Sequence, residues 1–188
     1  QKLSDVVKSI SLAYPLDSIR NKSQLYLNRI GEFDQTEEIY ILRIQDLENG
    51  FVKSEISKKE DHSLTTDIHV PEGEGPFPIL VYFHGGGWIS GSPKSHRKIC
   101  HRFAEAGFLV FNVDYALAPE NPFPQGFDEC CESVRWVVAN AEKYNGDSNR
   151  LSVGGDSAGG NLTAACAASL ADDSKVEIKK ILLIYGVF

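Results

Sequence analysis

Four continuous apolar segments in the second part of the chain most constrain what this sequence can fold into. They cover residues 78–83, 108–113, 150–153 and 181–185. Helix-length segments alternate with them, at about 93–106, 126–143 and 157–171. Strands that are apolar on both faces are typical of parallel sheets, because helices cover such sheets on both sides. The sequence therefore predicts an α/β fold with a mostly parallel central sheet.

The N-terminal part of the chain has a different pattern. Apolar residues follow the helical period from Leu3 to Ile10, Pro15 interrupts the pattern, and a second helical segment is expected over about 16–30. Strands are then expected over residues 39–44, 51–56 and 65–70. We therefore divide the chain into residues 1–50, helices with a lead-in strand, and residues 51–188, the core.

The composition limits the class of protein. The chain has 19 basic and 26 acidic side chains, and its net charge of −7 argues against nucleic acid or an anionic membrane surface as the partner. No run approaches the ~18 apolar residues of a membrane span. The cysteines are Cys100, Cys130, Cys131 and Cys166. They are too sparse for a disulfide framework, and the adjacent pair suits free thiols in a helix. We therefore expect a reduced, cytoplasmic protein.

The strongest chemical motif is the sequence Gly-Asp-Ser-Ala-Gly at residues 155–159, a G-x-S-x-G. It lies between a predicted strand and a helix rich in small residues. A serine on such a sharp turn projects its hydroxyl above the sheet, and the flanking glycines relieve crowding. The N–H groups at the start of the helix face any negative charge that develops there. The simpler alternative is a glycine-rich turn in which Ser157 only caps the helix.

The second motif is His-Gly-Gly-Gly-Trp at residues 84–88, directly after the strand 78–83. Consecutive glycines let backbone N–H groups turn toward a ligand, which is how an oxyanion hole is built from main chain. The alternatives are an ordinary loop or a phosphate cradle. A Walker A loop is excluded because Ser92 stands where lysine is required, and no G-x-G-x-x-G opens the following helix.

The two motifs together have the layout of α/β-hydrolase esterases, and the sequence resembles the hormone-sensitive-lipase-like family of carboxylesterases. Four matches carry the resemblance in order over about residues 65–188: His84–Gly87, Asp114–Glu120, Phe123–Pro124 and Gly155–Asn161. The resemblance implies the α/β-hydrolase fold, with the N-terminal helices as a cap over the pocket. Ala116 stands where the family usually has arginine, so any ion pair made there should be missing.

The resemblance also implies roles for individual residues. Ser157 matches the family's nucleophile. The N–H groups of Gly86, Gly87 and Ala158 match the donors of the oxyanion hole, and Gly85 shapes that turn. Neither a metal nor a cofactor is implied.

The histidines have simpler interpretations than catalysis. His84 is expected to order the glycine loop in a supporting role, because it precedes the oxyanion segment. His96 and His101 are five residues apart and do not share a helix face, so a metal site is not expected between them. His62 and His69 are expected to be solvated, in a turn and in an outer strand.

Two members of a catalytic triad are missing from the sequence. In this fold the triad residues follow the order serine, acid, histidine. Asp156 precedes the serine and is expected only to support the site. No histidine follows Ser157. The only later acids are Asp172, Asp173 and Glu177, too close in sequence to return from a later strand. Methionine is absent, and the apolar strand 181–185 is expected to be central. We therefore expect further strands after Phe188, with the fold truncated after about the sixth strand.

Two functions from different classes are compatible with these observations. The first is a serine hydrolase that cleaves small apolar carboxylic esters through an acyl-enzyme on Ser157. The second is a non-catalytic receptor that binds a small ligand on the same fold. The enzyme is favoured, because an intact serine turn and oxyanion loop have little purpose in a binder. The expected partner is a small-molecule ester, and a homo-oligomer is compatible with either function.

Overall fold

The computed structural model describes residues 52–58 and 63–188 of the chain. The helices and lead-in strand expected over residues 1–50, and His62, lie outside the described residues. The elements are, in chain order, β1 (Val52–Lys58), β2 (Ser63–His69), β3 (Phe77–Phe83), α4 (Pro93–Glu105), β4 (Leu109–Asp114), α5 (Gln125–Asn140), the 3-10 helix η2 (Ala141–Tyr144), β5 (Gly146–Asp156), α6 (Ala158–Ser169) and β6 (Lys180–Ile184).

The strands form one sheet in the order β1-β2-β4-β3-β5-β6. Strands β4, β3, β5 and β6 run parallel, whereas β2 is antiparallel to both of its neighbours. The mostly parallel sheet predicted from the apolar segments is therefore confirmed. Strand β5 begins four residues earlier than predicted, at Gly146, because Gly146 and Asp147 pair with Phe77 and Pro78 of β3 although they lack an apolar pattern.

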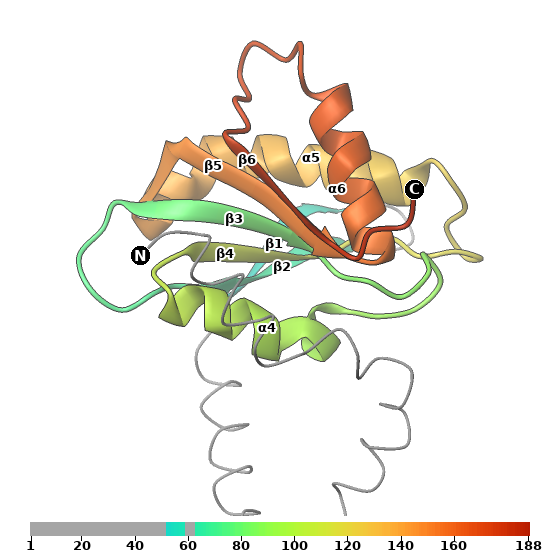
Figure 1. Ribbon diagram of the computed structural model, residues 1–188, viewed down its shortest axis with the longest axis horizontal. Coiled ribbons are helices and arrows are strands. Elements are labelled where there is room, and N and C mark those ends of the chain that lie inside the picture. Colours follow the sequence, from blue (N-terminus) through green and yellow to red (C-terminus); the bar gives the residue numbers. More distant parts are fainter. Residues whose placement is uncertain (1–51, 59–62) are drawn as a thin grey trace, which may run out of the picture. The chain divides into compact units, whose positions relative to one another are not determined.

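Helices cover both faces of the sheet (Figure 1): α4 lies on one face, and α5 and α6 lie on the other. Because side chains alternate along a strand, each strand sends one set of residues to each face. The set that faces α5 and α6 forms the main apolar core, for example Val81, Phe83 and Phe111. Helix α4 starts at a capping box in which Ser92 and Ser95 satisfy each other's backbone N–H groups.

The structure corrects one expectation. His69 is not solvated but fully buried, because β2 lies inside the sheet between β1 and β4 and packs under α4. Burial lowers the pKa of His69 from 6.5 to about 4. Strand β6 lies at an edge of the described sheet, and its residues Ile181 and Leu183 are about half exposed. Further strands beside β6 remain a prediction.

The cysteines agree with the expectation from their spacing. All four are buried free thiols, and Cys130 and Cys131 lie in α5. The Sγ atoms of Cys131 and Cys166 are 3.3 Å apart, which joins α5 to α6 by contact. None of the helices in the described part of the chain has the length and apolar character that a membrane span requires.

Candidate active site

Both sequence motifs begin at the same edge of the sheet. Strands β3 and β5 are parallel neighbours, and their last pairing joins Phe83 to Gly155. The glycine loop starts immediately after Phe83, and the serine turn starts at Gly155. The carboxyl edge of a parallel sheet is where ligands bind in open α/β folds. The strand register therefore brings the two motifs together although about 70 residues separate them.

Ser157 occupies a sharp turn between β5 and α6. Its backbone angles are φ 50° and ψ −117°, in a region that favours glycine. It is the N-cap residue of α6, but its hydroxyl makes no capping hydrogen bond with the described residues. Its N–H donates to the carbonyl oxygen of Ile184 over 2.9 Å, which ties the turn to the end of β6. A non-glycine residue held in such a conformation costs of order 1–3 kcal/mol, so the surrounding structure must enforce it. The side chain is half-buried rather than enclosed.

The glycines on either side of the serine allow α6 to approach the sheet. A Cβ on Gly155 would lie 2.5 Å from the carbonyl oxygens of Phe83 and Gly159. A Cβ on Gly159 would overlap the carbonyl oxygen of Phe83 and lie 2.8 Å from that of His84. Larger residues at these two positions would push the helix away from β3. The G-x-S-x-G pattern is therefore explained by backbone packing.

The glycine loop is folded into a tight turn. Gly86 has φ +137°, and its carbonyl oxygen accepts from the N–H of Ser90 over 3.0 Å and from the Ser90 hydroxyl over 2.8 Å. A Cβ on Gly86 would overlap the carbonyl oxygen of Ser90. At Gly87 the space is open: among the described residues, no atom outside its two chain neighbours lies within 4 Å of where a Cβ would lie. The loop is thus compact at Gly86 and exposed at Gly87.

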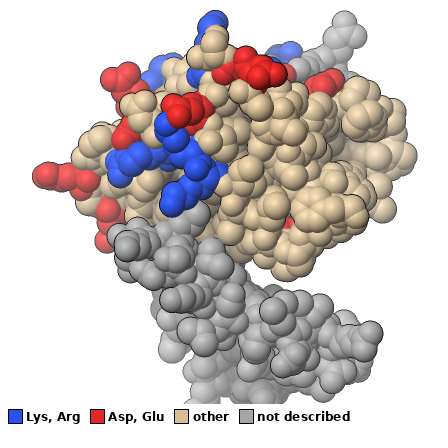
Figure 2. All heavy atoms as spheres, turned by 45° about the horizontal axis from the view of Figure 1, so that its top comes forward, with Lys and Arg blue, Asp and Glu red and all other residues tan. Residues whose placement is uncertain are grey.

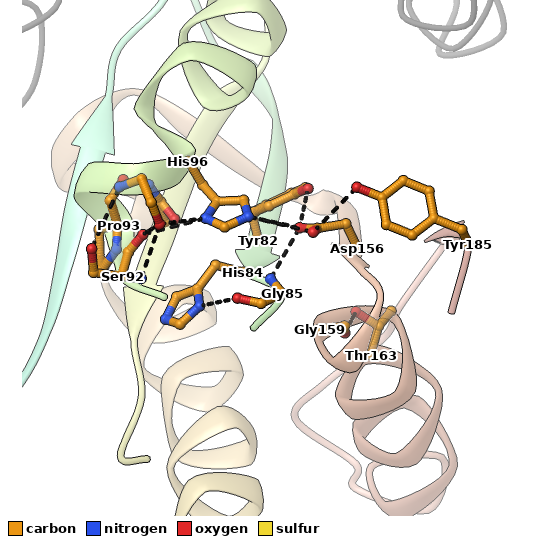
Figure 3. A network of polar contacts seen from close by, with 12 residues as sticks. Tyr82, His84, Gly85, Ser92, Pro93, His96, Asp156, Gly159, Thr163 and Tyr185 are labelled. Carbon is orange, nitrogen blue, oxygen red and sulfur yellow. Dashed lines mark hydrogen bonds and ion pairs between the residues drawn. The ribbon is translucent and has the colours of Figure 1, made fainter. Parts of the chain in front are cut away.

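Asp156, the residue before the serine, is the centre of a network of polar contacts (Figure 3). Its Oδ1 accepts from the hydroxyl of Tyr82 over 2.8 Å and from the backbone N–H of Gly85 over 3.1 Å. Nε2 of His96 lies 3.3 Å from Oδ1 and 3.4 Å from Oδ2, and the hydroxyl of Tyr185 lies 3.4 Å from Oδ2. The carboxylate therefore joins β3, the glycine loop, α4 and the segment after β6.

The network keeps Asp156 ionised. Burial opposes the charge, but the hydrogen bonds from His96, Tyr82 and Gly85 outweigh it and hold the pKa of the carboxyl below its usual value. Burial and the adjacent carboxylate raise the pKa of Tyr82 well above its ordinary value, so its hydroxyl remains a donor. A buried, hydrogen-bonded carboxylate thus lies directly before the serine.

His84 is built into the glycine loop. Its Nδ1 lies 2.9 Å from the carbonyl oxygen of Gly85 and must donate, because a carbonyl oxygen only accepts. Its ring stacks on Tyr115 with the centroids 4.4 Å apart, and the Tyr115 hydroxyl donates to the His84 carbonyl over 2.6 Å. Burial lowers the pKa of His84 to about 4, so the ring is neutral at pH 7. The contacts orient the loop, and burial keeps the ring from titrating near neutral pH.

The sequence did not predict that His96, Tyr82 and Tyr185 converge on Asp156. Tyr82 lies 74 residues before Asp156 and reaches it through the register of β3 and β5. His96 lies 60 residues before Asp156 and reaches it because α4 packs on the sheet. No sequence signal marks these contacts. His101, on the same helix as His96, instead lies 3.5 Å from Glu105. Over residues 52–58 and 63–188, no group of three potential ligands could hold a metal ion.

Ala116, where an arginine was expected, meets an acidic side chain through its backbone. Its N–H donates to Oε2 of Glu129 over 2.8 Å, and the side-chain amide of Gln125 approaches Oε1 at 3.3 Å. Glu129 is buried. The methyl side chain of Ala116 cannot make an ion pair, so a backbone hydrogen bond stands at this position.

Comparison with known proteins identifies the family. A model of the protein family described as α/β hydrolase fold matches residues 80–188. This range is more than half of the chain and includes both motifs. The chain belongs to this family. The α/β-hydrolase fold expected from the two motifs is therefore confirmed.

Known members of the family are similar over large parts of this α/β hydrolase. Carboxylesterase NlhH of Mycobacterium tuberculosis is 45% identical over 108 residues, which are 54% of this chain and 34% of that protein. A bacterial heroin esterase is 32% identical with a TM-score of 0.69, over 73% of this chain and 44% of that one. A hyperthermophilic esterase of Pyrobaculum calidifontis also has a TM-score of 0.69, with 32% identity over 78% and 48%.

The relatives bear on both the resemblance and the extent of the chain. Because they are carboxylesterases and esterases, the resemblance to the hormone-sensitive-lipase-like carboxylesterase family is confirmed. The chain spans less than half the length of the relatives and solved structures described above.

Proposed function

We propose that the protein hydrolyses small apolar carboxylic esters through an acyl-enzyme on Ser157. The observation that carries the proposal is the serine turn itself. Ser157 is half-buried in a strained conformation at the start of α6, directly beside a glycine loop that leaves the neighbouring strand at the same register. Such a turn presents the hydroxyl for attack on a carbonyl carbon. A turn that served only as a helix cap would not need this strain.

The oxyanion of the tetrahedral intermediate would be held by the N–H groups of Gly86, Gly87 and Ala158. Two features support this assignment. Gly86 and Gly87 have positive φ angles in an exposed or half-exposed turn, and Ala158 is the first residue of α6, where backbone N–H groups are unpaired. Loss of one such donor typically raises the activation barrier by about 3–4 kcal/mol.

The substrate would be a small uncharged ester. Figure 2 shows one face of the molecule on which basic side chains gather at one side with acidic ones beside them, while a broad area carries almost no charged side chain. The net charge of −7 is also unfavourable for a polyanionic substrate. We also propose that the chain divides into two domains at residue 50 and that it forms a homo-oligomer. We propose a cytoplasmic location from the spacing of the cysteines.

Hydrolysis also needs a base that activates the serine and an acid that orients the base. The test therefore uses the full-length gene product, with a fluorophosphonate probe and a short p-nitrophenyl ester. We expect labelling and turnover in the wild type. In Ser157→Ala we expect no labelling and turnover reduced at least about a thousandfold.

The matched control is Ser174→Ala, which removes an exposed hydroxyl in the segment after α6 and should change neither signal. Tight binding of a small ligand by the wild type, with neither labelling nor turnover, would contradict the proposal and favour the receptor.

A further inference from the structure

We propose that His96 is a positioning residue for the glycine loop: it acts through the carboxylate of Asp156 on the backbone N–H of Gly85, and so orients the turn that follows. The proposal rests on the proposed esterase function. It concerns a histidine on α4 that belongs to neither sequence motif (Figure 3). The chain of contacts that carries it is continuous from the start of α4 to the loop.

The first contact joins α4 to the residue before the serine. Nε2 of His96 lies 3.3 and 3.4 Å from the two carboxylate oxygens of Asp156. An ionised carboxylate only accepts hydrogen bonds, so Nε2 donates and carries the proton. Asp156 is 6% exposed, and a buried carboxylate depends on its donors for stabilisation. His96 is therefore one of the groups that keep this carboxylate in place.

The second contact joins Asp156 to the loop. Oδ1 accepts from the N–H of Gly85 over 3.1 Å, and the neighbouring peptide is held as well, because Nδ1 of His84 donates to the Gly85 carbonyl over 2.9 Å. In a trans peptide the N–H points opposite to the C=O. The Gly85 carbonyl and the Gly86 N–H belong to one peptide plane. Holding Gly85 at both its N–H and its carbonyl therefore sets the direction of the Gly86 N–H, a proposed oxyanion donor.

His96 is itself held by groups other than a substrate. Its Nδ1 lies 2.9 Å from the hydroxyl of Ser95, which forms the capping box of α4 with Ser92. Its ring stacks on the ring of His84 with the centroids 5.5 Å apart. The histidine thus has a fixed position before any ligand binds. Such preorganisation is what a group needs in order to orient another.

The test compares two substitutions with a matched control in the full-length protein. His96→Phe keeps a ring for stacking on His84 but cannot donate to Asp156, whereas His96→Gln keeps a donor. His101→Phe makes the same change five residues further along α4, where the histidine lies 3.5 Å from the half-exposed Glu105. Thermal unfolding of each variant shows whether it is folded.

Two readouts separate positioning from a general effect on stability. The first is the kcat and KM of ester hydrolysis. We expect kcat of His96→Phe to fall about tenfold with KM within about twofold, because loop orientation matters most in the transition state. The second is the amide proton shift of Gly85, measured by NMR with glycine-selective ¹⁵N labelling. It should move in His96→Phe, return most of the way in His96→Gln, and stay unchanged in His101→Phe.

The outcomes divide clearly. An unmoved Gly85 amide in His96→Phe overturns the proposal, as does an unchanged kcat or an equal effect of His101→Phe. A moved amide, with a loss in kcat that His96→Gln recovers, supports it. If the wild type neither hydrolyses the ester nor reacts with the fluorophosphonate probe, the proposed esterase function fails. The Gly85 amide then decides by itself whether His96 controls the loop.

Discussion

The face of the sheet that α5 and α6 cover is apolar, whereas the face that α4 covers carries buried polar side chains. On the first face the strands contribute residues such as Val81, Phe83 and Phe111. On the second face the neighbouring positions on the strands include Tyr82, Asn112 and Asp156, all buried. His96 contacts Asp156, and the carbonyl oxygen of Pro93, in the first turn of α4, accepts from Asn112. Arg97 donates to Asp67, a further buried side chain, on β2. The same strands therefore serve two purposes on alternating residues.

This difference teaches how the fold can be stable while its site is polar. Apolar burial is not directional, so the α5 and α6 face can stabilise the sheet without fixing any one loop. Hydrogen bonds are directional, so the α4 face can orient the loops at the carboxyl edge while contributing little net stability. Substitutions on the two faces should therefore have different consequences, and the comparison can be broken or sharpened by experiment.

The largest expected effect lies on the apolar face. Phe83→Ala removes a fully buried ring at the end of β3, and we expect it to lower the free energy of unfolding by about 3–5 kcal/mol because it leaves a cavity. Urea unfolding measures this. The matched control is Phe123→Ala, since Phe123 is 86% exposed, and its effect should stay within about 0.5 kcal/mol. Equal losses in the two variants would contradict the assignment of the core to this face.

An intermediate effect is expected on the polar face, and it depends on pH. Burial, with smaller contributions from His101 and Arg97, lowers the pKa of His69 from 6.5 to about 4. Between these pH values the unfolded chain binds more protons than the folded one, so stability falls as the pH drops from 6.5 toward 4. The contribution of His69 over this range is up to about 3 kcal/mol.

The free energy of unfolding should therefore fall less between pH 7 and pH 4.5 in His69→Phe than in the wild type. His84, whose pKa is also lowered to about 4, keeps part of the pH dependence in both proteins. An identical pH dependence in the variant and the wild type would show that His69 does not remain neutral in the fold.

The smallest effect is expected for an apolar replacement on the same polar face. Asn112 is fully buried, and its Nδ2 donates to the carbonyl oxygen of Pro93 over 3.0 Å. Within the described part of the chain, its Oδ1 accepts no hydrogen bond. Asn112→Leu loses one hydrogen bond but also removes this buried acceptor, so the free energy of unfolding should change by only about 1 kcal/mol. A loss as large as that of Phe83→Ala would mean that the polar face also carries the stability of the fold.

The elements that the sequence predicts well are those whose signal is local. The strands β3 and β4 agree with the apolar segments 78–83 and 108–113 to within a residue. The turn at Ser157 is predictable because its conformation depends on the five consecutive residues 155–159. Phe83 and Gly155 share one edge of the sheet because the parallel order places β3 beside β5.

The features that the sequence did not predict depend on contacts between distant elements. His69 looks like a solvated residue of an alternating strand, and only the covering helix α4 makes it buried. The contact between His96 and Asp156 spans 60 residues and exists because α4 starts beside the end of β5. Neither position has a local pattern that distinguishes it from an ordinary surface histidine.

The backbone conformation of Ser157 has a consequence for how this chain can change over generations. A residue with φ 50° is strained unless it is glycine, so a single substitution to glycine at this position would relieve the strain and remove the hydroxyl together. At this position glycine therefore favours stability, whereas serine favours the chemistry. A lineage freed from the need for the hydroxyl should lose this serine before it loses the glycines around it.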